Sequence, residues 1–396
     1  MERFGPFEIL RLLGRGGMAE AFVARRADGA GSGQLVVKRI RPDHAQREEY
    51  LRRFVLEAQV ASRLAHPNLV RFVEFGQVGQ GQYLAMEMVK GRSLHRLLDH
   101  LFLREEAPPV EVAISIGAGI LSGLAEMHAV TDENGQSRPM LHRDVTPANV
   151  ILSTEGRPVI IDFGITKDLF GPSLTLPGKV IGTARYMAPE HRRAEYLDPR
   201  ADVFSASVIL AELLLARHPW PPLSSIKELL RVTFDPPELT DAERRRLSPE
   251  LIEVLFRGLD CDRERRFPDA RAMLDALRAL PGYPTDGEQK TASWAQSLGV
   301  SLDEELVEPV VDLLPAGLPP AAPPAPTPEN SGEPRGAQVL ALPPLPPRRD
   351  SSLGSVGTLD LVAEVTVPSR RMWAWSLLGL GGVVLVGAVV ALLLSH

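Results

Sequence analysis

The spacing of apolar residues divides the first 280 residues of this 396-residue chain into strands and helices. Residues 21–26 and 34–40 are short apolar runs of the kind that form strands. Residues 47–64 and 108–128 instead place apolar side chains three and four positions apart, which predicts helices with one buried face. The chain up to about residue 280 is therefore expected to fold around a core.

The apolar periodicity stops after residue 280, where proline and alanine become frequent. A segment of this composition buries too little surface to offset the entropy that ordering removes. We expect residues 283–371 to form a disordered linker that is partly polyproline. Within it, residues 301–314 have helical spacing, which indicates either a docking element or a transient helix without a partner.

The last segment is uncharged over the 22 residues from Trp373 to Leu394. That length is sufficient to cross a hydrocarbon core of about 30 Å as a helix. Trp375 lies at the same end as Trp373, where indoles favour the membrane interface, and Arg370 and Arg371 lie just outside it. We expect residues 372–396 to be a single-pass anchor in the cell (inner) membrane, with the body of the chain cytoplasmic and the C-terminus outside. The alternative, a buried core helix, is disfavoured by the preceding linker.

Composition narrows the classes of partner. The net charge of −6 gives no indication of a nucleic-acid surface. The single cysteine, Cys261, excludes an internal disulfide and a cysteine-rich metal site, and we expect it to be a buried small hydrophobe in a reducing compartment. The N-terminus lacks the apolar run of a signal peptide. Gly387 and Ala391 form one small-residue pair, which gives little support for dimerisation of the anchor helix.

The first candidate functional motif along the chain is a cluster of three glycines, Gly14, Gly16 and Gly17. Glycines let a backbone approach phosphate groups, and the strand that follows indicates a hairpin lid and not a dinucleotide fold. Lys38 interrupts the next apolar strand, where an unpaired charge is costly to bury. Glu57 lies beside the apolar stripe of the predicted helix, so we expect a Lys38–Glu57 ion pair; the alternative is a lysine that extends to solvent.

Three further motifs follow in order: "HRDVTPAN" at residues 142–149, "DFG" at 162–164 and "APE" at 188–190. Together with the glycine loop, the lysine and the glutamate, this series resembles the eukaryotic-like (Hanks-type) serine/threonine protein kinases of bacteria. The resemblance covers about residues 7 to 280. It implies an α+β, two-lobed protein kinase fold over residues 1–282, with a small β-rich N-terminal lobe to about residue 88 and a large helical C-terminal lobe from residue 89.

The resemblance also implies ATP and Mg²⁺ as cofactors, with Mn²⁺ as a possible substitute. Asp144 would accept or orient the proton of the substrate hydroxyl, and Asn149 and Asp162 would hold the metal. Met86 would be the gatekeeper residue beside the adenine. In the glycine loop this chain departs from the family, because Ala19 and Ala21 replace the usual glycine and valine. The residues expected to bind ATP are Leu13, Gly14, Arg15, Gly16, Gly17, Ala21, Lys38, Met86, Glu87, Val89, Asn149 and Asp162.

Other residues take supporting roles by the same resemblance. Glu190 of the A-P-E element would pair with Arg266, and Asp202 would belong to a buried helix that supports the catalytic loop. Arg143 would pair with a phosphorylated activation loop, for which Ser173 and Thr175 are the candidate phosphosites.

Thr146 departs from the family, because serine/threonine kinases usually have a lysine at this position. Losing a cation beside the transferring phosphoryl group should raise the barrier. The polar set is otherwise complete, with Lys38, Glu57, Asp144, Asn149 and Asp162. We therefore expect an active, slower enzyme that phosphorylates serine or threonine of proteins, its own activation loop included. The alternative is a nucleotide-binding pseudokinase scaffold.

Overall fold

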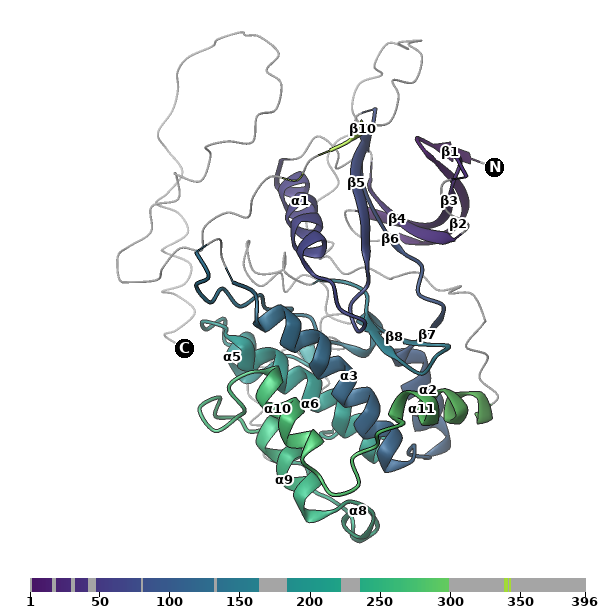
Figure 1. Cartoon of the computed structure of the whole chain (residues 1–396). Helices are drawn as coiled ribbons and strands as arrows, with labels where there is room; N and C mark the ends of the chain where they lie inside the picture. Colours follow the sequence, from purple (N-terminus) through teal and green to yellow (C-terminus); the bar gives the residue numbers. More distant parts are fainter. Residues whose placement is uncertain are drawn as a thin grey trace, which may run out of the picture. The chain divides into compact units, whose positions relative to one another are not determined.

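The computed structural model describes the chain in segments. They are residues 2–15, 19–29, 33–41, 48–79, 81–131, 134–163, 184–221, 236–298, 338–340 and 342. These residues form a two-lobed fold, with a β-rich N-terminal lobe and a helical C-terminal lobe, as the sequence predicts (Figure 1).

The N-terminal lobe is built on a seven-stranded sheet of order β1-β2-β3-β4-β6-β5-β10. Its strands, all paired antiparallel, are β1 (Glu2–Phe4), β2 (Phe7–Arg15), β3 (Ala19–Arg26), β4 (Gln34–Ile40), β5 (Phe72–Val78), β6 (Gly81–Glu87) and β10 (Gln338–Val339). One helix, α1 (Glu48–Arg63), packs beside β5 (Figure 1). The helix turns Phe54, Ala58 and Ala61 into the core, as its apolar spacing predicts.

A second sheet of three strands begins the C-terminal lobe. It consists of β7 (Gly91–Ser93), β8 (Val150–Ser153) and β9 (Pro158–Ile160). A 3-10 turn, η1 (Pro147–Asn149), leads directly into β8, so this sheet fixes the end of the H-R-D segment. Gly91 has φ of 157°, and a Cβ there would collide with the backbone of β8, which explains why only glycine fits.

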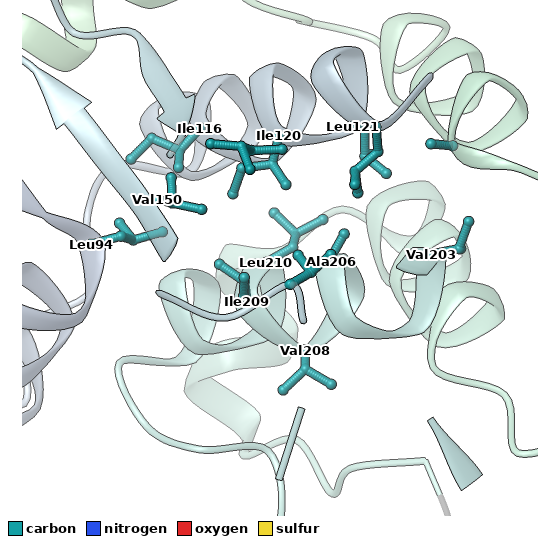
Figure 2. Close-up of a cluster of buried hydrophobic side chains, with 14 of the residues drawn as sticks. Leu94, Ile116, Ile120, Leu121, Val150, Val203, Ala206, Val208, Ile209 and Leu210 are labelled. Atoms are coloured by element: carbon teal, nitrogen blue, oxygen red, sulfur yellow. The ribbon is translucent and has the colours of Figure 1, made fainter. Parts of the chain in front are cut away.

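Helices make up the rest of this lobe. They are α2 (Leu94–Arg104), α3 (Val110–His128), α5 (Pro189–Arg192), α6 (Pro199–Leu215), α8 (Asp241–Arg246), α9 (Pro249–Gly258), α10 (Ala270–Arg278) and α11 (Gly287–Ser297). The core lies between α3 and α6, where Ile116, Ile120 and Leu210 meet (Figure 2). α6 is buried on every side, so its residues are mostly apolar all round and the helix is not amphipathic; its few polar residues, such as Asp202 and Glu212, are buried as well.

Within the described residues, α3 alone has the length and apolar composition that a membrane span requires. Most of it is buried against α6, α10 and α11, so it is a core helix of the C-terminal lobe. The predicted anchor, residues 372–396, lies outside the described residues, as does the helix predicted at 301–314.

Two findings correct the predicted linker. Residues 287–297 form α11, whose Thr291 and Ala295 are fully buried against the C-terminal lobe, so the disordered segment does not begin at residue 283. Residues 338 and 339 form β10 on the edge of the large sheet, so the prediction of disorder is also wrong there. Cys261, expected to be buried, is only half-buried.

Candidate active site

Lys38 is the centre of a three-residue cluster between the lobes. Its Nζ lies 2.6 Å from Glu57 Oε1 and 3.4 Å from Asp162 Oδ1. Burial alone would lower the pKa of Lys38, but the carboxylates of Asp162 and Glu57 outweigh it and raise the pKa, so the ammonium stays charged. Burial raises the pKa of Glu57, whereas the positive charge and hydrogen bond of Lys38 lower it and favour the carboxylate. The predicted Lys38–Glu57 ion pair is therefore present and largely shielded from water.

The rotation of α1 places Glu57 in this cluster. Phe54 and Ala58 on the same helix are fully buried, and the ring of Phe54 packs on Phe75 of β5 with centroids 6.2 Å apart. Glu57 lies one turn beyond Phe54, on the side that faces β4. Apolar packing of α1 on the sheet thus sets whether the ion pair can form.

The H-R-D segment presents Asp144 next to Asn149. The side-chain amide of Asn149 donates to the backbone oxygen and to Oδ2 of Asp144, at 2.8 Å in each case. Both amide hydrogens are then used, so the side-chain oxygen of Asn149 remains as an acceptor. Asp144, Thr146 and Asn149 are all buried, which places the candidate base in a rigid loop.

Asp202, at the start of α6, fixes the backbone of the H-R-D segment by hydrogen bonds. Its carboxylate accepts from the backbone N–H groups of His142 at 2.7 Å and Arg143 at 2.8 Å, and it lies 3.0 Å from His128 Nε2. Burial would raise the pKa of Asp202, but the hydrogen bond and charge of His128, with the Arg143 N–H, lower it. Arg143 has φ of 66°, a left-handed conformation that is uncommon for arginine, and the two bonds to Asp202 hold it there.

The strand before Asp162 is attached to the same loop. The backbone N–H of Ile161 donates to the backbone oxygen of Asn149 at 3.0 Å, and buried Phe163 packs 6.5 Å from the His142 ring. Asp162 therefore lies between Lys38 on one side and the Asn149 loop on the other. A carboxylate and an amide oxygen are hard ligands that suit Mg²⁺, which takes one or two protein ligands and completes its shell with water and phosphate oxygens. The side chains fit that metal, and Asn149 and Asp162 would hold it.

Several predicted nucleotide contacts lie where a hairpin lid and a hinge should be. Gly14 pairs with Ala21, and Ala21 pairs with Lys38, so β2, β3 and β4 bring these three positions into one row. Leu13 is buried, whereas the side chain of Arg15 is exposed and pairs with the buried carboxylate of Glu20. Gly16 and Gly17 lie outside the described residues.

The predicted hinge follows β6. Met86 is buried and pairs with Val36 of β4, as expected of a residue behind the adenine. The backbone N–H of Glu87 donates a hydrogen bond to the backbone oxygen of Arg71. Among the described residues, the backbone of Val89 makes no hydrogen bond, which leaves it for a ligand.

Glu190 and Arg266 form a buried bidentate pair, with N–O distances of 2.7 and 2.9 Å. Arg266 also donates to the backbone oxygens of Asp260 and Arg200, so one guanidinium joins α5, α6 and the loop before α10. The pair expected from the resemblance is present. The phosphosite candidates, Ser173 and Thr175, lie outside the described residues.

A second buried network was not predicted from the sequence. The Tyr186 hydroxyl donates to both oxygens of Glu212 at 3.0 Å, and His218 lies 3.9 Å from the same carboxyl. Burial raises the pKa of Glu212 to about 8 and lowers that of His218 to about 4. The available signal was a single glutamate inside the apolar run that forms α6.

Comparison with known proteins agrees with this geometry. The model of the protein kinase domain family matches residues 7–276. The chain belongs to the protein kinase family. Its relatives are Hanks-type kinases of bacteria at about 30% identity, so the predicted family and two-lobed fold are confirmed.

Three relatives show the extent of the similarity. "Tyrosine-protein kinase MasK" of Myxococcus xanthus is 32% identical over 76% of this chain and 46% of its own length. "Serine/threonine-protein kinase PknD" of Mycobacterium tuberculosis is 31% identical over 68% of this chain and 38% of its own. A crystal structure of the M. tuberculosis PknI kinase domain, in a cysteine-to-alanine variant, superimposes with a TM-score of 0.51 at 27% identity, covering 70% of this chain and 96% of that one. The chain thus spans less than half the length of the two curated relatives.

Proposed function

We propose that this protein kinase transfers the γ-phosphate of Mg-ATP to serine or threonine hydroxyls of proteins. The observation that carries the proposal is the closed Lys38–Glu57 ion pair, which also contacts Asp162. Kinases need this lysine, glutamate and aspartate in place together before transfer occurs. Asp144, beside Asn149, supplies the remaining catalytic group.

Each side chain has a separate part in the reaction. Lys38, kept charged by its two carboxylates, would orient the α- and β-phosphates. Asp144 would hold the substrate hydroxyl in line and accept its proton as the new oxygen–phosphorus bond forms and the bond from the γ-phosphorus to the β–γ bridging oxygen breaks, leaving ADP. Asn149 and Asp162 would hold Mg²⁺, which would supply positive charge to the phosphate oxygens.

The acceptor residue is the least constrained part of the proposal. The tyrosine-kinase signatures of the catalytic loop are absent, and PknD is named as a serine/threonine kinase, which favours serine and threonine. The similarity to MasK, named as a tyrosine kinase, makes tyrosine the second candidate. A pseudokinase scaffold is disfavoured, because no base or metal residue of the family is replaced in this chain.

We also propose that residues 372–396 anchor the kinase in the membrane, with the kinase domain on the cytoplasmic side. The support is the uncharged run from Trp373 to Leu394 and the arginines at 370 and 371. Activation-loop autophosphorylation at Ser173 or Thr175 belongs to the same proposal. Its support is Arg143, whose position before Asp144 suits a phosphate partner.

One experiment tests the activity. The full chain is incubated with labelled ATP, Mg²⁺ and a generic protein substrate, and phosphoamino acids are then identified in both proteins. We expect phosphoserine or phosphothreonine from the wild type. Asp144→Asn keeps the shape of the side chain but loses the base, so incorporation should fall by at least about a hundredfold.

The controls separate the alternatives. Asp144→Asn must keep the thermal unfolding midpoint of the wild type within a few degrees, so that loss of label is not loss of fold. Phosphotyrosine alone would replace the proposed acceptor with the second candidate. Equal label in wild type and Asp144→Asn would leave the scaffold as the better explanation.

A further inference from the structure

The edge of the large sheet is covered by a segment from far along the chain. β10 pairs antiparallel with β5, with Gln338 opposite Gln77 and Val339 opposite Gly76, and the Leu340 N–H donates to the Phe75 oxygen at 3.0 Å (Figure 1). Without β10, β5 would be the edge strand and would expose unpaired backbone groups. A Cβ at Gly76 would meet the Tyr83 ring and hydroxyl at 2.6 and 2.5 Å and the Gln338 oxygen at 2.8 Å, so glycine at this position leaves room both for Tyr83 and for β10.

The segment contributes apolar side chains as well as backbone. Leu340 and Leu342 are half-buried and pack against the core cluster that contains Phe54 and Phe75. Val339, which precedes Leu340 in the chain, instead points to solvent, with 63% of its surface exposed. The sequence then continues with two prolines, which cannot donate to a ladder and so limit the strand to this short stretch.

The contacts lead from this strand to the catalytic ion pair in three steps. Leu340 bonds to the backbone of Phe75, the Phe75 ring packs on Phe54 of α1, and Glu57 lies one turn beyond Phe54 and pairs with Lys38. The rotation and position of α1 depend on its packing against β5. A strand that fixes β5 from its outer side therefore favours the position of α1 in which the ion pair is closed.

The path of the chain adds a second constraint. α11 packs on α3 in the C-terminal lobe, whereas β10 pairs within the N-terminal lobe. The chain after the kinase domain therefore contacts both lobes, which are the two parts that must be aligned for transfer.

We propose that β10, with Leu340 and Leu342, is a docking strand that acts in cis: bound to β5, it holds α1 in the ion-paired position and raises the rate of phosphoryl transfer. The effect on rate rests on the proposed kinase function, but the docking does not. Release of the strand, for instance when a partner binds this segment, would lower activity without touching the active site.

Docking is tested by cross-linking in the full chain with Cys261→Ser. Gln77→Cys combined with Gln338→Cys places two thiols at partner positions of an antiparallel ladder, where the Cα separation of about 5.5 Å suits a disulfide. We expect rapid oxidation to an intramolecular disulfide, seen by mass spectrometry. Arg71→Cys combined with Gln338→Cys is the control, because Arg71 precedes β5 at the end away from the residues that pair with β10 and should not react.

The effect on rate is tested with matched charges. Leu340→Asp places a carboxylate against the apolar cluster, whereas Val339→Asp places it in solvent. We expect Leu340→Asp to lower kcat at least about fivefold and Val339→Asp to leave it unchanged. Oxidising the 77/338 cysteine pair in the Leu340→Asp chain should restore most of the rate, because the covalent bond replaces the lost packing.

The possible results separate docking in cis, its effect on the rate, and the proposed kinase function. No disulfide, or one that joins two chains after singly substituted chains are mixed, would overturn docking in cis. A disulfide with equal kcat in Leu340→Asp and wild type would overturn the effect on rate. An inactive wild type, when the disulfide still forms in the 77/338 cysteine variant, would instead count against the proposed kinase function.

Discussion

At the scale of single residues, Thr146 stands where serine/threonine kinases usually have a lysine. The side chain is buried beside Asp144, yet its hydroxyl makes no hydrogen bond among the described residues, and the Asn149 amide bonds to Asp144 instead. The hydroxyl is thus not what orients the base. We infer that Thr146 replaces a transition-state cation with a neutral group.

Restoring the cation should then speed the chemical step. Thr146→Lys is expected to raise kcat several-fold, a gain of about 1 kcal/mol, with the KM for ATP nearly unchanged, because the new contact strengthens as charge develops. Thr146→Ala should change the rate little. Single-turnover rates at saturating Mg-ATP compare the three proteins. A lysine variant slower than the wild type would show that the loop is fitted to threonine.

Glu212 provides a pH-dependent test of the second buried network. Its pKa in the fold, about 8, lies above the ordinary 4.5, so the folded protein binds a proton that the unfolded chain releases between these values. Stability from this residue is complete below about pH 4.5 and is lost as pH rises through 8. The groups that act on the Glu212 carboxyl are known. Tyr186 donates a hydrogen bond to it, Arg185 and Asp99 act on it through their charges, and His218 stays neutral above about pH 4.

Glu212→Gln removes this titration but keeps the acceptor for Tyr186. The variant should gain stability over the wild type as pH rises from 5 to 9, by roughly 3 kcal/mol or more in the difference of unfolding free energies. Urea unfolding at pH 5, 7 and 9 measures it. A difference that does not vary with pH would mean that the carboxyl is ionised throughout.

At the scale of elements, the motifs were easier to predict than the ends of the domain. Lys38 and Glu57 were predictable because a charged residue in or beside an apolar strand or helix face needs a partner to be buried, whereas the role of Asp202 was predicted only from the family resemblance. α11 was missed because it is short and polar and follows a proline-rich turn; its only signal is Gly287, Thr291 and Ala295, small residues spaced four apart. β10 is too short for any periodicity, since two strand residues carry no alternation to detect.

The packing of α11 makes it part of the folded unit. Its Glu288 pairs with Arg157 at 3.1 Å, and Gly287 lies against Ser115 of α3, where a Cβ would meet the hydroxyl. Thr291→Arg would force a long charged side chain into a fully buried site, and we expect it to lower the thermal midpoint by several degrees. The exposed Lys290→Arg is the matched control, and differential scanning fluorimetry reads both. An unchanged midpoint for Thr291→Arg would indicate that α11 is detached in solution.

At the scale of the whole molecule, the ordered series of motifs sufficed to predict two lobes, because each motif belongs to one place in the kinase fold. The sequence could not show that the chain beyond residue 282 returns to the folded body. That return depends on tertiary contacts of α11 and β10, which local composition does not encode. Proline and alanine content predicts that a segment has little core of its own, but it does not exclude short segments that use the core of another part of the chain.

The proposed anchor is the remaining question at this scale, and it rests on hydropathy alone. Val384→Arg with Leu385→Arg would place two charges near the middle of the span, at a cost of about 2.5–3.5 kcal/mol each, so the variant should move from the membrane to the soluble fraction. Val384→Leu with Leu385→Val is the matched control and should remain with the membrane after alkaline extraction.

Protease added outside intact cells should leave the kinase domain whole in the wild type, because the arginines at 370 and 371 favour the cytoplasmic side. Digestion of the kinase domain there would reverse the proposed orientation, and a double-arginine variant that stays in the membrane would remove residues 373–394 as the anchor.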